Sequence, residues 1–344
     1  MSDGSVNQTL FFVRSMNKKD LRIVFMGTPA FAVESLRYLV EGGYSVVGVV
    51  TMPDKPAGRG HKVQYSPVKD YALQQGLTLL QPERLKDELF LLQLRSLHAD
   101  LQIVVAFRML PEVVWDMPRF GTFNLHASLL PQYRGAAPIN WAIIRGEKET
   151  GATTFFLSHE IDTGKVIFQK KIRIDEKDTA GTIHDKLMSM GAGMVVETVE
   201  RVLAGNLEAT EQEQLIAEGV SLKHAPKIFK ETCEIKPGLS VEDAHNLVRG
   251  LSPYPAAWVN LRIPGQDEAI ILKVFETEKC LGVDAVGCVK TAEAGMPHLP
   301  GSFVTDGKKK AGIALRDGIL WFSSVQAPAK KRMTAEEWLR GLRL

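Results

Sequence analysis

Short apolar runs alternate with helical patterns along the first part of the chain. Residues 21–26 are an apolar run that ends at Gly27, and residues 44–51 are a second one. Between them, residues 31–40 place apolar side chains at helical spacing. This order predicts a strand, a helix and a strand, as in the β-α-β units of parallel sheets. Further on, the pattern predicts helices and one more apolar strand, in the order 67–75, 87–97 and 101–107.

The stretch from Gly121 to Pro138 follows, and it combines a strand with a rigid loop. Residues 122–126 suit a pleated strand, and the prolines and glycine after them predict an irregular loop. Asn124 and His126 lie on one face of that strand, about 7 Å apart at ~3.3 Å per residue. A histidine in a buried strand is commonly a hydrogen-bonded core residue. Two polar side chains on one face instead favour a pair of N–H donors for a developing oxyanion.

The pattern predicts two domains and a fold of the α/β class. Later in the first domain we expect a helix, two strands and a long helix, over 137–145, 153–158, 166–174 and 179–203. Residues 207–226 carry four glutamates without a clear period, which is typical of a linker. Beyond it, the helix 240–249 and five short strands predict a small OB-like β-barrel, with strands over 258–263, 269–276, 286–291, 312–315 and 319–325.

The expected organisation is therefore an extension over 1–19, a Rossmann-like domain with a mostly parallel sheet over 20–206, the linker 207–226 and the OB-like domain 227–344. The first turn reads Gly27-Thr-Pro29 and lacks the Gly-x-Gly-x-x-Gly of dinucleotide-binding domains, so a dehydrogenase is disfavoured.

A second candidate group is Asp162-Thr-Gly164, between the two expected strands. The same triplet occurs in aspartic proteases, which need two such aspartates, whereas this chain has one copy beside a β-α-β pattern. An aspartate that accepts backbone N–H groups in a tight turn is the structural alternative.

Basic residues gather in three places. The long loop 52–67 contains Arg59 and Lys62 beside glycines, and it is either a solvated loop or a finger for a phosphate backbone. The C-terminal domain contains two dense clusters that suit RNA phosphates, Lys308, Lys309 and Lys310, and Lys330, Lys331 and Arg332.

Composition narrows the class of protein. At 344 residues, with 45% hydrophobic and 24% charged residues, the chain suits a globular protein of two domains. The net charge of +2 is too small to indicate a nucleic-acid partner by itself. Three cysteines without a Cys-x-x-Cys pair predict neither disulfides nor a metal site, and they favour the cytoplasm. No apolar run approaches ~18 residues, so no membrane span is expected. We also expect a monomer.

The composite motif resembles a known family. Asn124-Leu-His126, Ser128-Leu-Leu-Pro131 and Arg134-Gly-Ala-Ala-Pro138 together resemble the signature of formyltransferases that use 10-formyltetrahydrofolate. The sequence from about residue 21 onward resembles the branch of that family that acts on methionyl-tRNA. The resemblance implies 10-formyltetrahydrofolate as formyl donor, without a metal, and methionyl-initiator tRNA as acceptor, for translation initiation.

The resemblance also implies roles for individual residues. It makes Asn124, His126 and Asp162 the catalytic set. It places Ser128, Leu129, Leu130 and Pro131, together with Arg108, Met109 and Leu110, along the folate pocket, although many family members carry glycine where Arg108 stands. Arg59 matches the arginine of a Pro-x-x-Pro-x-Gly-Arg-Gly insertion that enters the acceptor region of the tRNA.

In the reaction so implied, the neutral amine of methionyl-tRNA attacks the formyl carbon. Asn124 and His126 stabilise the oxyanion, and Asp162 orients His126 and assists proton transfer. Other readings remain: a formyltransferase for glycinamide ribonucleotide or an amino sugar, a formyl-folate hydrolase, or a non-catalytic RNA-binding protein. The barrel and the Arg59 loop favour tRNA, and the complete catalytic set favours an enzyme.

Overall fold

The chain forms two compact units in a computed structural model that describes residues 16–57, 62–281 and 299–342. The first unit contains the chain up to His126 together with Thr153–Phe168 and Met188–Leu215. The second contains Ala127–Ala152, Gln169–Leu187 and the chain from Ile216 onward. Several elements therefore begin in one unit and end in the other.

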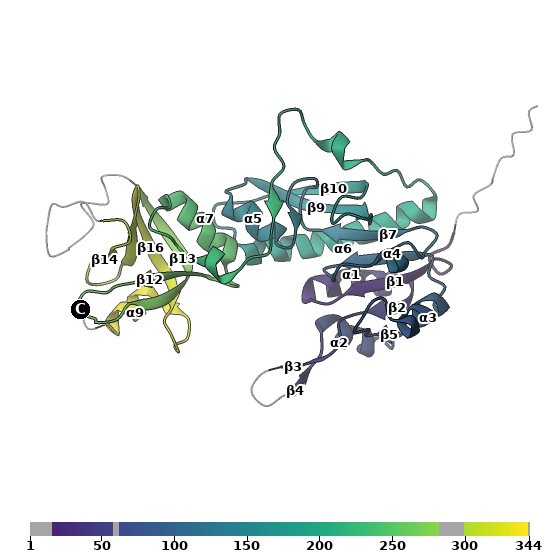
Figure 1. Cartoon of the computed structure of the whole chain (residues 1–344), viewed down its shortest axis with the longest axis horizontal. Coiled ribbons are helices and arrows are strands. Elements are labelled where there is room, and N and C mark those ends of the chain that lie inside the picture. The colour runs from purple at the N-terminus through teal and green to yellow at the C-terminus, as the bar shows by residue number, and fades with distance from the viewer. Residues whose placement is uncertain (1–15, 58–61, 282–298, 343–344) are drawn as a thin grey trace, which may run out of the picture. The chain divides into compact units, whose positions relative to one another are not determined.

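A seven-stranded sheet organises the N-terminal part (Figure 1). Its strands lie in the order β10 (Val166–Arg173), β9 (Glu149–Phe156), β7 (Thr122–His126), β6 (Leu101–Val105), β1 (Arg22–Gly27), β2 (Ser45–Val50) and β5 (Leu79–Leu80). The strands from β7 to β5 pair in parallel, and β9 pairs with β7 in the antiparallel direction. The predicted mostly parallel α/β sheet is confirmed.

Both faces of the parallel strands are buried, as such sheets require. On one face, Val24 and Met26 of β1 join a core cluster with Phe90 and Leu94. The alternate residues of β1 point to the other face and are also buried. The helices that accompany these strands are α1 (Ala30–Glu41), α2 (Pro67–Gln74), α3 (Glu88–Ser96), the short α4 (Glu112–Trp115) and α6 (Ala180–Ala204). Thr179 accepts from the backbone N–H of Thr182, as a cap of α6 should.

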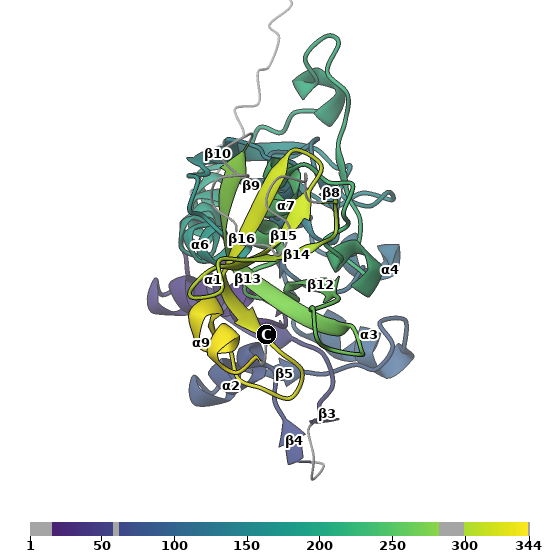
Figure 2. The same cartoon turned by 90° about the vertical axis from the view of Figure 1, so that its left-hand side faces the viewer.

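The C-terminal part is a curled antiparallel sheet, a half-barrel, and the predicted OB-like β fold is confirmed. Its strands are β12 (Ala257–Leu261), β13 (Ile270–Leu281), β16 (Gly318–Gln326), β15 (Ala311–Leu315) and β14 (Phe303–Thr305), with β17 (Met333–Thr334) beside β16. Helix α7 (Val241–Leu251) buries its apolar face in one cluster with residues of these strands and with Trp338 of α9 (Ala335–Arg340). Figure 2 shows α9 next to β16 at the end of this sheet.

Helix α7 also packs tightly against α5 (Pro138–Ile144), within the second unit. The Asn140 side chain donates to the carbonyl of Gly250 at 2.7 Å. A Cβ on Gly250 would lie 2.9 Å from the Asn140 carbonyl oxygen, so only glycine permits this approach. Arg249 is buried and donates to the carbonyls of Asp175 and Asp178. These contacts bind the start of the C-terminal sequence to residues far upstream.

The structure differs from the predicted elements in a few places. The loop 52–67 contains a small antiparallel hairpin, β3 (Lys55–Ala57) and β4 (Lys62–Gln64), which the sequence pattern did not predict. Strand β9 begins at Glu149, four residues earlier than expected. The short elements α4, β5, β14, β17 and α9 were not predicted, since pieces this short carry no clear hydrophobic period. The expected strand 286–291 and residues 1–15 of the expected extension lie outside the described residues.

Candidate active site

Strand β7 presents Asn124 and His126 from within the sheet. It is hydrogen-bonded to β6 on one side and to β9 on the other, so its backbone is held along both edges. Phe123 and Leu125 are buried on the face opposite to the two polar residues. His126 is itself 7% exposed, and its ring meets the Phe155 ring edge-on at 6.4 Å between centroids. A rigid strand therefore sets the direction of both candidate donors.

Asp162 approaches His126 from the turn between β9 and β10. Its Oδ2 lies 3.9 Å from Nδ1 of His126, and the Asp162 side chain is 15% exposed. This separation is longer than a hydrogen bond and close enough for an ion pair when the imidazole is protonated. Asp162 has φ 57°, a left-handed conformation that costs energy in a non-glycine residue. The fold thus brings together two of the predicted catalytic residues, which are far apart in the sequence.

The turn that carries Asp162 is held by Gln212. This residue opens the 3-10 helix η1 (Gln212–Leu215) and is fully buried. Its side-chain amide donates to the carbonyls of Asp162 at 2.9 Å and of Gly164 at 2.8 Å. Gly164 is required by space, because a Cβ there would lie 1.7 Å from the Phe156 carbonyl oxygen. Sequence reasoning missed Gln212, which stands in a glutamate-rich stretch without hydrophobic periodicity.

The loop after β6 is held in place by contacts of Arg108 and Leu110 with other parts of the first unit. Arg108 donates to the carbonyls of Pro82 and Glu83, the latter at 2.8 Å. Burial lowers the pKa of its guanidinium. Leu110 is buried in the core cluster that contains α3, whereas Met109 is 74% exposed. Of the three residues predicted here for the donor pocket, Met109 is the one whose side chain is free of core packing.

The segment Ser128–Pro131 belongs to the second unit. The Ser128 hydroxyl donates to the carbonyl of Gln132 at 2.7 Å, and Gln169 donates to the carbonyl of Leu130 at 2.7 Å. Ser128, Leu130 and Pro131 are buried, and Leu129 is half-buried. These contacts make the segment rigid, which suits the wall of a pocket.

Residues 223–225 hold the next part of the signature loop, also within the second unit. The short strand β8 (Arg134–Gly135) pairs with β11 (His224–Ala225). The backbone N–H of Tyr133 donates to the carbonyl of Lys223 at 2.6 Å. Gly135 has φ 125°, and a Cβ there would lie 2.4 Å from the Ala225 carbonyl oxygen. Close backbone approach therefore explains the glycine of the Arg-Gly-Ala-Ala-Pro motif.

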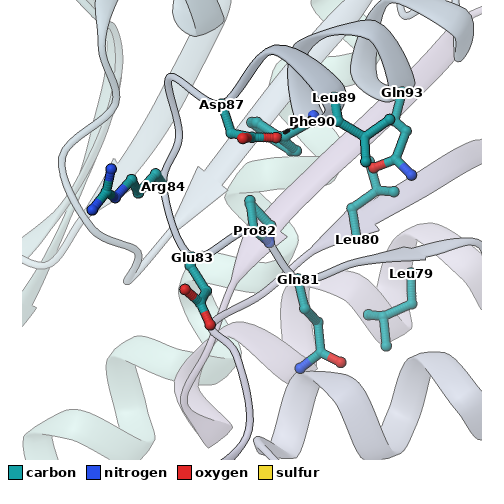
Figure 3. A pocket seen from close by; sticks show the side chains of 10 residues that line it. All are labelled: Leu79, Leu80, Gln81, Pro82, Glu83, Arg84, Asp87, Leu89, Phe90 and Gln93. Carbon is teal, nitrogen blue, oxygen red and sulfur yellow. Dashed lines mark hydrogen bonds between the residues drawn. The ribbon is translucent and has the colours of Figure 1, made fainter.

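A pocket with a volume of about 570 Å³ lies in the first unit. Its wall includes Pro82 and Glu83, whose carbonyls accept from Arg108 (Figure 3). None of Asn124, His126 and Asp162 lines it. Its wall combines apolar and polar side chains, from Leu79, Leu80, Gln81, Pro82, Glu83, Arg84, Asp87, Leu89, Phe90 and Gln93. The candidate catalytic groups therefore lie outside this pocket.

Two family models match the chain. The formyl transferase model matches residues 21–199, and the formyl transferase C-terminal domain model matches residues 227–343. The chain is 59% identical to a methionyl-tRNA formyltransferase from Bacteroides thetaiotaomicron, over 96% of this chain and 98% of that protein. The chain belongs to the methionyl-tRNA formyltransferases.

Solved structures share the fold at low identity. WlaRD, a sugar 3N-formyl transferase, has a TM-score of 0.60 at 17% identity, over 92% of this chain and all of its own length. HypX from Aquifex aeolicus has a TM-score of 0.59 at 17% identity, over 94% of this chain and 48% of HypX. Both similarities concern the fold alone.

The comparisons confirm the predicted family and enzyme class. They make the readings as a sugar or glycinamide ribonucleotide formyltransferase and as a non-catalytic RNA-binding protein wrong, since the close relatives over nearly the whole chain are methionyl-tRNA enzymes. The family is one of folate-dependent formyltransferases. Among the described residues, no group of three His, Cys, Asp or Glu side chains could hold a metal ion, and no helix there could cross a membrane.

The basic clusters of the C-terminal domain differ in how their side chains are engaged. Asp306 accepts from the backbone N–H groups of Lys308, Lys309 and Lys310, which fixes the turn. The three lysines are exposed, and Nζ of Lys310 lies 3.9 Å from a carboxylate oxygen of Glu278. Lys330 and Lys331 are also exposed, whereas Arg332 pairs with Glu276. Of the residues predicted for tRNA in the first unit, Lys62 lies in β4, and Arg59 lies outside the described residues.

The Gln212 contacts generate a prediction about turnover. Gln212→Leu removes both hydrogen bonds that hold the Asp162 turn, so kcat should fall by roughly tenfold to a hundredfold, because small displacements of catalytic groups are costly. Gln214→Leu is the matched control, because Gln214 is exposed on the same 3-10 helix. Steady-state kinetics and thermal unfolding should be measured on both variants. Equal kcat in the two variants would contradict the assigned role of Gln212.

Proposed function

We propose that Asn124, His126 and Asp162 carry out formyl transfer from 10-formyltetrahydrofolate to the α-amine of methionyl-initiator tRNA, which prepares that tRNA for translation initiation. The observation that carries this proposal is the approach of Asp162 to His126, 3.9 Å between Oδ2 and Nδ1, at the end of a strand that also bears Asn124. Carboxyl ends of strands are where open α/β sheets bind ligands.

Formyl transfer requires hydrogen-bond donors that stabilise negative charge on the formyl oxygen. When the neutral amine attacks the formyl carbon, the carbonyl oxygen becomes an oxyanion and needs donors that are already in position. The amide N–H of Asn124 and a ring N–H of His126 can supply them. Both residues lie on a strand that is paired along both edges, so little reorganisation is needed as the charge develops.

Proton movement accompanies the same step. The attacking nitrogen loses one proton, and N10 of the folate gains one as its bond to the formyl carbon breaks. Asp162 orients the imidazole through Nδ1 and stabilises its charged form, directly or through one water across the 3.9 Å separation. Such contacts commonly shorten when substrate binds.

We assign the formyl donor to the loop 108–110 and the segment Ser128–Pro131. Rigid backbone supports this assignment, since Arg108 ties the first loop to residues 82 and 83 and Gln169 ties the second at Leu130. The WlaRD structure was determined in the presence of 5-N-formyl-THF, and one HypX structure holds tetrahydrofolic acid, so proteins of this fold take up reduced folates.

We assign the acceptor tRNA to the β3–β4 hairpin with Arg59 and Lys62, and to Lys308, Lys309, Lys310, Lys330, Lys331 and Arg332 of the C-terminal domain. The division into a catalytic domain over 20–206, a linker over 207–226 and a tRNA-binding domain over 227–344 is part of the same proposal. The monomeric state and the cytoplasmic location stay sequence-based predictions.

The catalytic assignment is tested by substituting each member of the set. Asn124→Ala, His126→Ala and Asp162→Asn should each lower kcat by roughly two decades or more, because the removed groups act on the transition state. Donor affinity and the melting temperature should stay near those of the unmodified enzyme. The double variant of His126 and Asp162 should lose less than the product of the single losses, since the two act as a unit. An Asp162→Asn enzyme with ordinary kcat would exclude Asp162 from the mechanism.

The acceptor assignment in the first unit is tested with Arg59→Ala. The variant should lose roughly tenfold or more in kcat/KM for methionyl-tRNA, because a phosphate-binding arginine is removed, while the affinity for the folate donor is unchanged. Both constants should be measured on the same preparation. Equal losses toward tRNA and donor would refute the separation of the two sites.

The C-terminal assignment predicts a change in salt dependence. Replacing Lys308 and Lys309 together by alanine should weaken tRNA binding and lower the slope of log Kd against log salt by roughly 0.7–0.9 for each phosphate that the protein no longer neutralises. Lys86→Ala, at an exposed lysine of the first unit, serves as the control. An unchanged slope in the double variant would show that this turn does not contact RNA.

A further inference from the structure

The hairpin of β3 and β4 stands clear of the sheet, beyond α2 and β5, in both views (Figures 1 and 2). Each of its strands has three residues. A two-stranded hairpin this short is marginally stable by itself in water. Its direction must therefore be imposed where it joins the body of the first unit, by the residues just before β3 and just after β4.

One buried lysine contacts both of these connections. Lys69, in the first turn of α2, is 9% exposed. Its ammonium group bonds the carboxylate of Asp54, the residue before β3. The same Nζ lies 3.9 Å from the ring centroid of Tyr65, the residue after β4, in a cation–π contact. Lys69 thus contacts both the residue that precedes the hairpin and the residue that follows it.

Further polar contacts complete the base of the hairpin. Gln81, which follows β5, donates from Nε2 to the carbonyl of Met52 at 2.9 Å and to Oδ1 of Asp54 at 3.0 Å. The hydroxyls of Thr51 and Ser66 lie 2.9 Å apart and join the two connections directly. The hairpin is consequently attached to both α2 and the end of β5.

The choice of lysine at this position is informative. The neighbouring buried residues of α2 are Val68 and Ala72, and an apolar side chain at position 69 would satisfy packing alone. Burying an ammonium group costs hydration free energy and side-chain entropy, which its partners must offset. Hydrogen bonds of a charged group depend on angle as well as distance, so the contact of Lys69 with Asp54 fixes the direction in which the chain leaves the sheet. An apolar contact would not fix that direction.

We propose that Lys69 is a positioning residue that directs the β3–β4 hairpin toward the acceptor end of the bound tRNA. This inference rests on the proposed contact between the hairpin and tRNA. Lys69 acts through Asp54 and Tyr65 on the direction of β3 and β4, and it touches no substrate itself. The donor side is held independently, because Arg108 contacts the carbonyls of residues 82 and 83.

The first test is Lys69→Met, which keeps the length of the side chain and removes its charge. We expect kcat/KM for methionyl-tRNA to fall by roughly tenfold to a hundredfold, with an unchanged KM for the folate donor. Lys186→Met is the matched control, since it removes the ion pair of Lys186, on α6, with Asp178 in the second unit. Lys69→Arg should recover part of the loss, because a guanidinium can still bond Asp54.

The second test combines the substitution with Arg59→Ala. If Lys69 acts through the hairpin, Lys69→Met should cost little more once Arg59 is gone. Trypsin should also cut the Lys69→Met enzyme faster at Lys55, Arg59 or Lys62, with the remaining cleavage pattern unchanged. Should Lys69→Met unfold the protein, Asp54→Asn gives the same test, because it removes the charge and keeps an acceptor for Gln81.

The outcomes separate the two proposals. Ordinary tRNA kinetics in Arg59→Ala would overturn the tRNA role of the hairpin. Impaired kinetics in Arg59→Ala together with ordinary kinetics in Lys69→Met and Asp54→Asn would overturn the positioning role of Lys69 alone. An equal loss from Lys69→Met with and without Arg59 would show that Lys69 acts on some other part of the enzyme.

Discussion

The approach of Asp162 to His126 is the contact on which the arrangement of this enzyme depends. His126 is fixed by the pairing of β7, while Asp162 lies on a turn between two strands and has a left-handed backbone conformation. The buried side-chain amide of Gln212 helps to hold this turn by donating to two of its carbonyls. The proposed catalytic geometry therefore depends on Gln212, which lies outside the proposed catalytic set.

The chain after α6 serves the candidate site as well as connecting domains. Its beginning supplies Gln212 to the Asp162 turn in the first unit. Its end supplies β11, which pairs with the loop of the signature motif in the second unit. A segment predicted to be a linker thus makes specific hydrogen bonds with the first unit near its beginning and with the second unit near its end.

Three of the segments that we propose to bind substrate are held in the same way. Arg108 ties the loop after β6, Gln169 ties the segment of Leu130, and Lys69 with Gln81 ties the base of the hairpin. In each case a long polar side chain binds backbone or carboxylate oxygens of a neighbouring segment. Preorganised loops of this kind lose little entropy when substrate binds, so more of the binding energy is available for the transition state.

Local pattern was sufficient for much of this protein. Apolar runs and helical spacing in the sequence determined the parallel sheet, the long helix α6 and the class of the C-terminal domain. The spacing of apolar residues along a short stretch shows whether it forms a strand or a helix, and which face is buried. The i, i+2 spacing placed Asn124 and His126 on one face. Only the tertiary structure showed that Asp162 lies near His126 and that Gln212 holds the turn that carries Asp162. The same is true of the contacts that Lys69 makes at both ends of the β3–β4 hairpin. These contacts join residues up to 50 positions apart in the sequence. Hydrophobic periodicity describes neighbouring residues only, so it cannot show which distant side chains the folded chain brings together.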